Sequence, residues 1–133
     1  MKITNILSWA LRYLATIILL QTLYFKFTGH VESVELFTKL GVEPWGRIGT
    51  GVIELITGIL LLIPTMGFIG SFLSFGLMSG AILSHVTVLG IESHGDGGTL
   101  FTLAIIVFII SLILMYIHKN EGLKLYNKIL KKN

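Results

Sequence analysis

Three ionisable side chains interrupt stretches of the chain that are otherwise apolar: Lys26, Glu54 and His85. Ionisable groups are costly inside a membrane, and those that occur there often bind ligands or carry protons. A lysine beside a carboxylate can grip a polar ligand, and an imidazole can donate a hydrogen bond or transfer a proton. A structural interpretation stands beside this one, because a buried ion pair can fix helix packing and a buried histidine can bond to a neighbouring helix. The residue types agree with both.

The composition explains why so few such residues are present. The chain has 133 residues, of which 53% are hydrophobic and 13% are charged, whereas a soluble domain carries about 25% charged residues. These values indicate a membrane protein and exclude a soluble enzyme and a disordered chain. The absence of cysteine excludes thiolate nucleophiles, disulfide exchange and iron–sulfur clusters. The net charge of +3 does not indicate nucleic acid as a partner, because the basic residues are concentrated in one short tail.

Four segments are apolar and close to the length of about 20 residues that a helix needs to cross a bilayer. They are approximately residues 6–27, 47–63, 67–89 and 98–117. Every backbone polar group must be paired internally in lipid, so these segments are predicted to be helices. We therefore predict an all-α, four-helix transmembrane bundle over residues 1–118, followed by a basic cytoplasmic tail over 119–133. The first span is interpreted as a retained helix and not a cleaved signal peptide, because Arg12 interrupts its apolar run.

The distribution of Lys and Arg predicts the orientation of the bundle. Lysines gather at the two ends of the chain, whereas five of the seven acidic residues fall in the first and third loops. We therefore expect both termini on the cytoplasmic side of the cell (inner) membrane and these two loops outside. Apolar residues recur at helical spacing over residues 31–40, which predicts a short amphipathic helix in the first outer loop. The tail has two interpretations, a helix lying on the anionic inner leaflet and a solvated lysine-rich segment.

This orientation places Lys26, Glu54 and His85 in the outer half of the membrane. Glu54 is about seven residues, roughly 10 Å, from the outer end of its span at 1.5 Å per residue. We expect Lys26 and Glu54 to pair there, with the imidazole of His85 nearby. Arg12 lies in the inner half with no acid at its level, so we expect it to have a structural role and to extend toward the cytoplasmic headgroups.

The outer loops contribute four further candidates: His30, Glu92, His94 and Asp96. Imidazole and carboxylate groups are suitable metal ligands, but the spacing of these residues matches no compact metal motif, and no metal is predicted. The glycines around Asp96 indicate a turn, with Asp96 near the N-cap of the fourth helix. In the third span, glycines at positions 76 and 80 form a motif that allows two helices to approach closely.

Taken in order along the chain, these segments resemble the DoxX-like family of small membrane proteins. The resemblance covers about residues 8–117 and rests on Arg12 and on segments 24–29, 40–44, 51–62, 80–90 and 96–101. It implies four short spans with both termini inside. Arg12, Lys26 and Glu54 correspond to polar positions that recur in the family, without an established catalytic role. His85 and the turn at Asp96 look specific to a subgroup.

The resemblance also implies a redox function, since some DoxX proteins are subunits of membrane complexes that pass electrons from sulfur compounds to quinone. We therefore expect a subunit of, or accessory to, a quinone-linked oxidoreductase, with quinone as the candidate ligand and a partner protein supplying the electron carrier. Two alternatives are a small transporter with Glu54 as its coupling carboxylate and a non-catalytic membrane scaffold. Gln21, opposite Arg12 on the first span, makes a homo-oligomer a further candidate.

Overall fold

The computed structural model describes residues 2–131, which form helices joined by short turns and contain no strand. Met1, Lys132 and Asn133, which belong to the predicted domain and tail, lie outside the described residues. The elements are α1 (Lys2–Gln21), α2 (Leu23–Phe27), α3 (Val31–Lys39), α4 (Trp45–Leu62), η1 (Pro64–Met66), α5 (Gly67–Ser84), η2 (His85–Leu89), α6 (Thr99–Ile117) and α7 (Lys119–Lys131). Of these, η1 is a 3-10 turn and η2 is a π-helical turn.

Within residues 2–131, four helical segments are long and apolar enough to cross a membrane: Lys2–Phe27, Trp45–Leu62, Pro64–Leu89 and Thr99–Ile117. Each predicted span falls on one of them, although the first begins at Lys2 instead of residue 6. The short amphipathic helix predicted in the first loop is α3. The predicted all-α membrane bundle is therefore confirmed.

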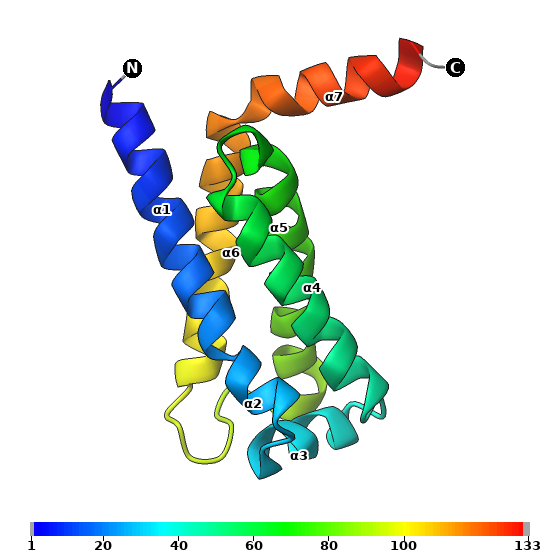
Figure 1. The fold of residues 1–133 in the computed structure, drawn as a ribbon. Coiled ribbons are helices and arrows are strands. Elements are labelled where there is room, and N and C mark those ends of the chain that lie inside the picture. Colours follow the sequence, from blue (N-terminus) through cyan, green and yellow to red (C-terminus); the bar gives the residue numbers. More distant parts are fainter. Residues whose placement is uncertain (1, 132–133) are drawn as a thin grey trace.

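The start of α1 and the whole of α7 lie at one end of the bundle, which we call the tail end (Figure 1). The helices α2 and α3 and the loop over residues 90–98 lie at the opposite end, called the loop end below (Figure 1). The helix α7 does not continue the direction of α6 but runs across the tail end. The two ends of the described chain therefore lie on the same side of the bundle, because an even number of spans returns the chain to the side where it began.

The spans pack in a ring, in which α1 and α5 each contact both α4 and α6. The centre of the ring is filled by small and medium-sized apolar side chains: Ala15, Leu19, Leu61, Met78, Ala104, Val107, Ile110 and Leu114. One polar contact crosses this core, where the Ser111 hydroxyl donates to Ser74 Oγ at 2.8 Å. Many large apolar side chains, such as Ile17 and Phe72, point outward and are exposed. This distribution suits a surface surrounded by acyl chains.

Close helix approach occurs at Gly70 of α5. A Cβ atom at this position would lie 3.0 Å from the backbone nitrogen of Leu61 in α4. A Cβ atom at Gly76 or Gly80 would meet nothing within 4 Å. The expected close approach at the Gly76 and Gly80 motif is therefore not made within the chain, because these glycines lie on the outward face of α5.

These contacts predict opposite outcomes for two similar substitutions. Gly70→Leu should lower the free energy of unfolding by about 1–3 kcal/mol, because the new side chain is forced against the backbone of α4. Gly76→Leu is the matched control and should cost little, since its side chain enters open space. Reversible unfolding in detergent micelles, followed by circular dichroism, measures both. Equal destabilisation by the two variants would contradict this packing.

Candidate functional site

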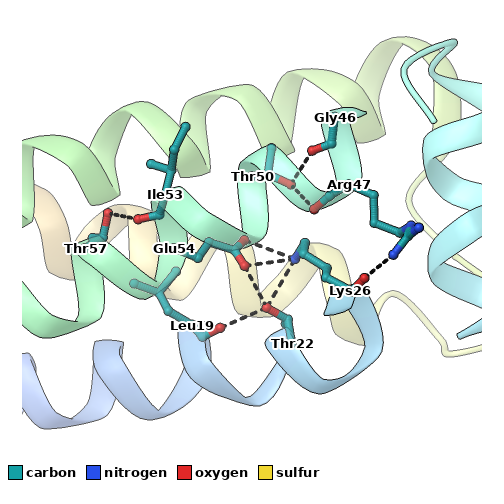
Figure 2. Close-up of polar contacts among 9 residues, drawn as sticks. All are labelled: Leu19, Thr22, Lys26, Gly46, Arg47, Thr50, Ile53, Glu54 and Thr57. Carbon is teal, nitrogen blue, oxygen red and sulfur yellow. Dashed lines mark hydrogen bonds and ion pairs between the residues drawn. The ribbon is translucent and has the colours of Figure 1, made fainter. Parts of the chain in front are cut away.

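Lys26 of α2 and Glu54 of α4 form a buried ion pair at the loop end (Figure 2). The Lys26 ammonium lies 3.1 Å from Oε1 and 3.0 Å from Oε2 of Glu54, so it bridges both carboxylate oxygens. The two side chains are only 13% and 8% exposed. Each charge lowers the desolvation cost of the other. The pairing expected between the first two spans is therefore present.

Thr22 completes this cluster (Figure 2). Its Oγ1 accepts from the Lys26 ammonium at 3.2 Å. The single hydroxyl hydrogen has two acceptors within reach, Glu54 Oε2 at 3.0 Å and the Leu19 carbonyl at 2.8 Å. Thr22 was not among the predicted site residues, although its position one helical turn before Lys26 was an available signal. We call Thr22, Lys26 and Glu54 the ion-pair cluster.

Arg47, in the first turn of α4, connects the ion-pair cluster to the end of α2. Its Nη1 donates to the backbone carbonyl of Lys26 (Figure 2). Its Nε donates to Glu43 Oε1 at 2.8 Å. A cation is favourable at the C-terminal end of a helix, where carbonyls lack partners and the helix dipole is negative. Arg47 was not among the predicted site residues, although the spacing from Glu43 to Arg47 could have indicated this pair.

His85 makes its contacts with residues outside the ion-pair cluster. Its Nδ1 donates to the Gly90 carbonyl at 2.9 Å, and the Gly90 N–H donates back to the His85 carbonyl at 2.8 Å. These reciprocal bonds close the π-helical turn η2, and the ring packs edge-on against Phe101 of α6 at 5.6 Å between centroids. Among the described residues, no hydrogen bond joins His85 to Lys26 or Glu54. The expected pair of Lys26 and Glu54 is thus observed, whereas the imidazole of His85, in a residue only 3% exposed, is bonded within its own turn.

The other loop-end candidates form separate local contacts. His94 Nε2 donates to Glu35 Oε2 of α3 at 2.6 Å. His30 precedes α3 as its N-cap and packs edge-on against Phe25, while Glu92 accepts from a backbone N–H of its own loop. Within residues 2–131, no three His, Asp or Glu side chains are grouped so that they could hold a metal ion.

Asp96 caps the start of α6. Its Oδ2 accepts from the Leu100 N–H at 3.0 Å, and its Oδ1 accepts from the N–H groups of Gly98 at 2.8 Å and Ser93 at 3.0 Å. These backbone donors, that of Leu100 first, lower the pKa of the Asp96 carboxyl below its ordinary value, because they favour the ionised form. The expected position of Asp96 near the cap is observed, although the N-cap residue itself is Gly98.

Arg12 is only 1% exposed and lies between helices. Its Nη2 donates to the carbonyl of Ile63, the C-cap residue of α4, at 2.6 Å. The centre of its guanidinium lies 4.4 Å from the ring centroid of Trp9. The expected extension toward the headgroups is not observed, because the unpaired carbonyls at the end of α4 provide partners inside the bundle. The role that the geometry supports for Arg12 is structural.

The ion-pair cluster predicts a non-additive response to substitution. Lys26→Met leaves the Glu54 carboxylate buried without a counter-charge and should lower the free energy of unfolding by about 3–5 kcal/mol. The double variant Lys26→Met/Glu54→Leu has no charge left in the ion-pair cluster and should regain most of this loss. Unfolding in mixed micelles measures both, with Lys39→Met, an exposed lysine of α3, as the control. A double variant less stable than Lys26→Met would contradict the pairing.

The capping carboxylate predicts a pH-dependent start of α6. Asp96→Ala should lower the stability of the first turn by about 1 kcal/mol, seen as faster hydrogen exchange at the Leu100 amide. The pKa of Asp96 is below its ordinary value of 3.8, so its contribution is complete above that pH and is lost as the pH falls below it. The wild-type protein should therefore lose protection at Leu100 in this acidic range. A similar loss in Asp96→Ala would show that another group is responsible.

A sequence model of the DoxX-like family matches residues 10–114 of the chain. The matched region contains the ion-pair cluster, Arg12, Arg47 and His85, and it includes most of all four spans. Comparison with curated proteins and with solved structures returned no match. Because the match extends over well more than half of the chain, this multi-pass membrane protein belongs to the DoxX-like family.

Proposed function

We propose that this protein is a non-catalytic membrane subunit of, or an accessory to, a quinone-linked oxidoreductase, and that the ion-pair cluster contacts the quinone headgroup. The observation that supports this is the donor and acceptor set that Lys26, Thr22 and Glu54 bring together inside a membrane span. An oxidised quinone headgroup offers two carbonyl acceptors, and its reduced form offers two hydroxyl donors. A site that meets both forms therefore needs donors and acceptors side by side.

The ion-pair cluster contains both. The Lys26 ammonium has three N–H donors, and its three contacts are the two Glu54 oxygens and Thr22 Oγ1. A quinone carbonyl would take the place of one of these acceptors. The Glu54 carboxylate can accept from a quinol hydroxyl, and the Thr22 hydroxyl can either donate or accept. The three side chains thus match the headgroup in both redox states.

Electrons would come from a partner protein. The chain has no cysteine, so it cannot supply thiolate ligands for an iron–sulfur cluster. A partner oxidoreductase that holds the electron carrier would dock on the bundle, and the membrane subunit would bind and orient the headgroup. The quinone supplies the two-electron, two-proton chemistry when it is bound.

We also propose that the tail end faces the cytoplasm and that the protein resides in the inner membrane. Five lysines of the described chain belong to the start of α1 and to α7, both at the tail end: Lys2, Lys119, Lys124, Lys128 and Lys131 (Figure 1). Positively charged residues near span ends favour the cytoplasmic side. The ion-pair cluster then lies in the outer half of the bilayer and would exchange protons with the outside.

The two tryptophans allow a direct test, because Trp9 belongs to α1 near the tail end and Trp45 opens α4 at the loop end. The variants Trp9→Phe and Trp45→Phe each keep one tryptophan, Trp45 and Trp9 respectively. In nanodiscs that contain ubiquinone or menaquinone, the quinone should quench the fluorescence of Trp45 at a lower concentration than that of Trp9. Adding Lys26→Met/Glu54→Leu should remove this preference. Adding Ser111→Ala, which alters the buried Ser74 contact in the core, should keep it. Equal quenching of the two tryptophans would contradict the proposal.

Substitutions in the ion-pair cluster also distinguish the other candidate functions. A transporter that uses Glu54 as its coupling carboxylate would show substrate flux in proteoliposomes that Glu54→Gln abolishes, without preferential quenching of Trp45. A scaffold would show neither effect, and its partner binding would be unaffected by the Lys26→Met/Glu54→Leu change.

A further inference from the structure

The helix α7 is strongly amphipathic and lies across the tail end of the bundle (Figure 1). At 100° per residue, its apolar side chains share one face, and every lysine of α7 after Lys119 lies on the other. The apolar face carries four side chains that are each more than half exposed: Leu123, Tyr126, Ile129 and Leu130. The opposite face carries Lys124, Lys128 and Lys131. Nothing within the described chain covers the apolar face beyond the first turn of α7.

The contact with α5 shows which way the apolar face is turned. Gly122 lies on this face, and a Cβ atom there would lie 2.8 Å from the Phe68 ring. Phe68 belongs to the first turn of α5, where the third span begins. The apolar face of α7 is therefore turned toward the spans, and Lys124, Lys128 and Lys131 are turned away from them. This is the orientation of a helix that lies in the membrane interface.

The first turn of α7 is held in place by a chain of polar contacts. Glu121 Oε2 accepts from the backbone N–H of Phe68 at 3.1 Å, and its Oε1 accepts from His118 Nδ1 at 3.1 Å. The Ser8 hydroxyl of α1 in turn donates to His118 Nε2 at 2.7 Å. These contacts join α7 to α5 and α1, and they occupy the one acidic side chain of α7. Among the described residues, no ion pair joins Lys124, Lys128 or Lys131 to an acidic side chain.

We propose that α7 is an interfacial helix that binds anionic lipid headgroups of the leaflet at the tail end. Its apolar side chains would enter the region between headgroups and acyl chains, while its lysines contact the phosphates. Two observations favour lipid as the occupant: the apolar face is turned toward the apolar spans, and the exposed charge is positive, which selects anionic over zwitterionic lipid. An acidic protein partner could reach only the lysine face. The inference is independent of the proposed redox role.

The absence of cysteine makes single-cysteine probes specific. Spin labels at Ile129→Cys and Asn120→Cys report the apolar and polar faces, since the two positions are 180° apart at 100° per residue, and both variants keep every lysine. In nanodiscs of phosphatidylcholine with phosphatidylglycerol, the Ile129→Cys label should be accessible to oxygen and shielded from a water-soluble nickel chelate. The Asn120→Cys label should show the reverse. Equal access of nickel to both labels would mean that α7 is solvated and would overturn the proposal.

The charge requirement is tested by Lys124→Gln/Lys128→Gln/Lys131→Gln. These exposed substitutions should leave the unfolding midpoint unchanged and should reduce the excess of phosphatidylglycerol over phosphatidylcholine among retained lipids by roughly tenfold or more. Lys39→Gln, an exposed lysine at the loop end, is the control and should retain that excess. Unchanged enrichment in the triple variant would refute lipid recognition by α7. Lysine-dependent binding of an acidic protein without lipid enrichment would likewise refute it.

Discussion

Backbone carbonyls at the end of a helix have no partner within that helix, and inside a bilayer they have no water either. The first two spans each supply a donor for a terminal carbonyl of the other. Arg12 of α1 donates to the carbonyl of Ile63 where α4 ends, and Arg47 at the start of α4 donates to the carbonyl of Lys26 where α2 ends. The helices are antiparallel, so each arginine meets the negative end of the other helix dipole. The ion-pair cluster depends on this arrangement, because Arg47 holds α2 where Lys26 reaches Glu54.

The features that could be predicted from the sequence are those imposed by lipid or by local spacing. Apolar length predicts the four spans, since an unpaired backbone is excluded from the bilayer core. Depth along the spans brought Lys26 and Glu54 to the same level, and their pairing follows because isolated charges are expensive there. The cap at Asp96 follows from its position beside a glycine-rich turn. Each of these features is determined by the residues of one segment or by the depth at which they lie in the membrane.

The remaining features depend on which helix faces pack against each other, and the amino-acid composition does not determine this directly. The partner of Arg12 is a carbonyl of α4, so its burial follows from where that helix ends. His85 bonds within its own turn because η2 widens to a π-helix and closes on Gly90. The close approach of α4 and α5 uses Gly70, whereas Gly76 and Gly80 point outward. A glycine motif identifies a helix that can pack closely without identifying the face that does so.

The interruption at Thr22 divides the first span into α1 and α2. The segment beyond it, α2, is only five residues long, and α4 holds it at Lys26 both by the ammonium and by the backbone carbonyl. Replacing Glu54 by an apolar residue would remove only the first of these two attachments. The contact between Arg47 and the Lys26 carbonyl and the packing of the apolar core do not involve the carboxylate. A change at Glu54 would therefore act on the loop end of the first span, without rearrangement of the whole bundle.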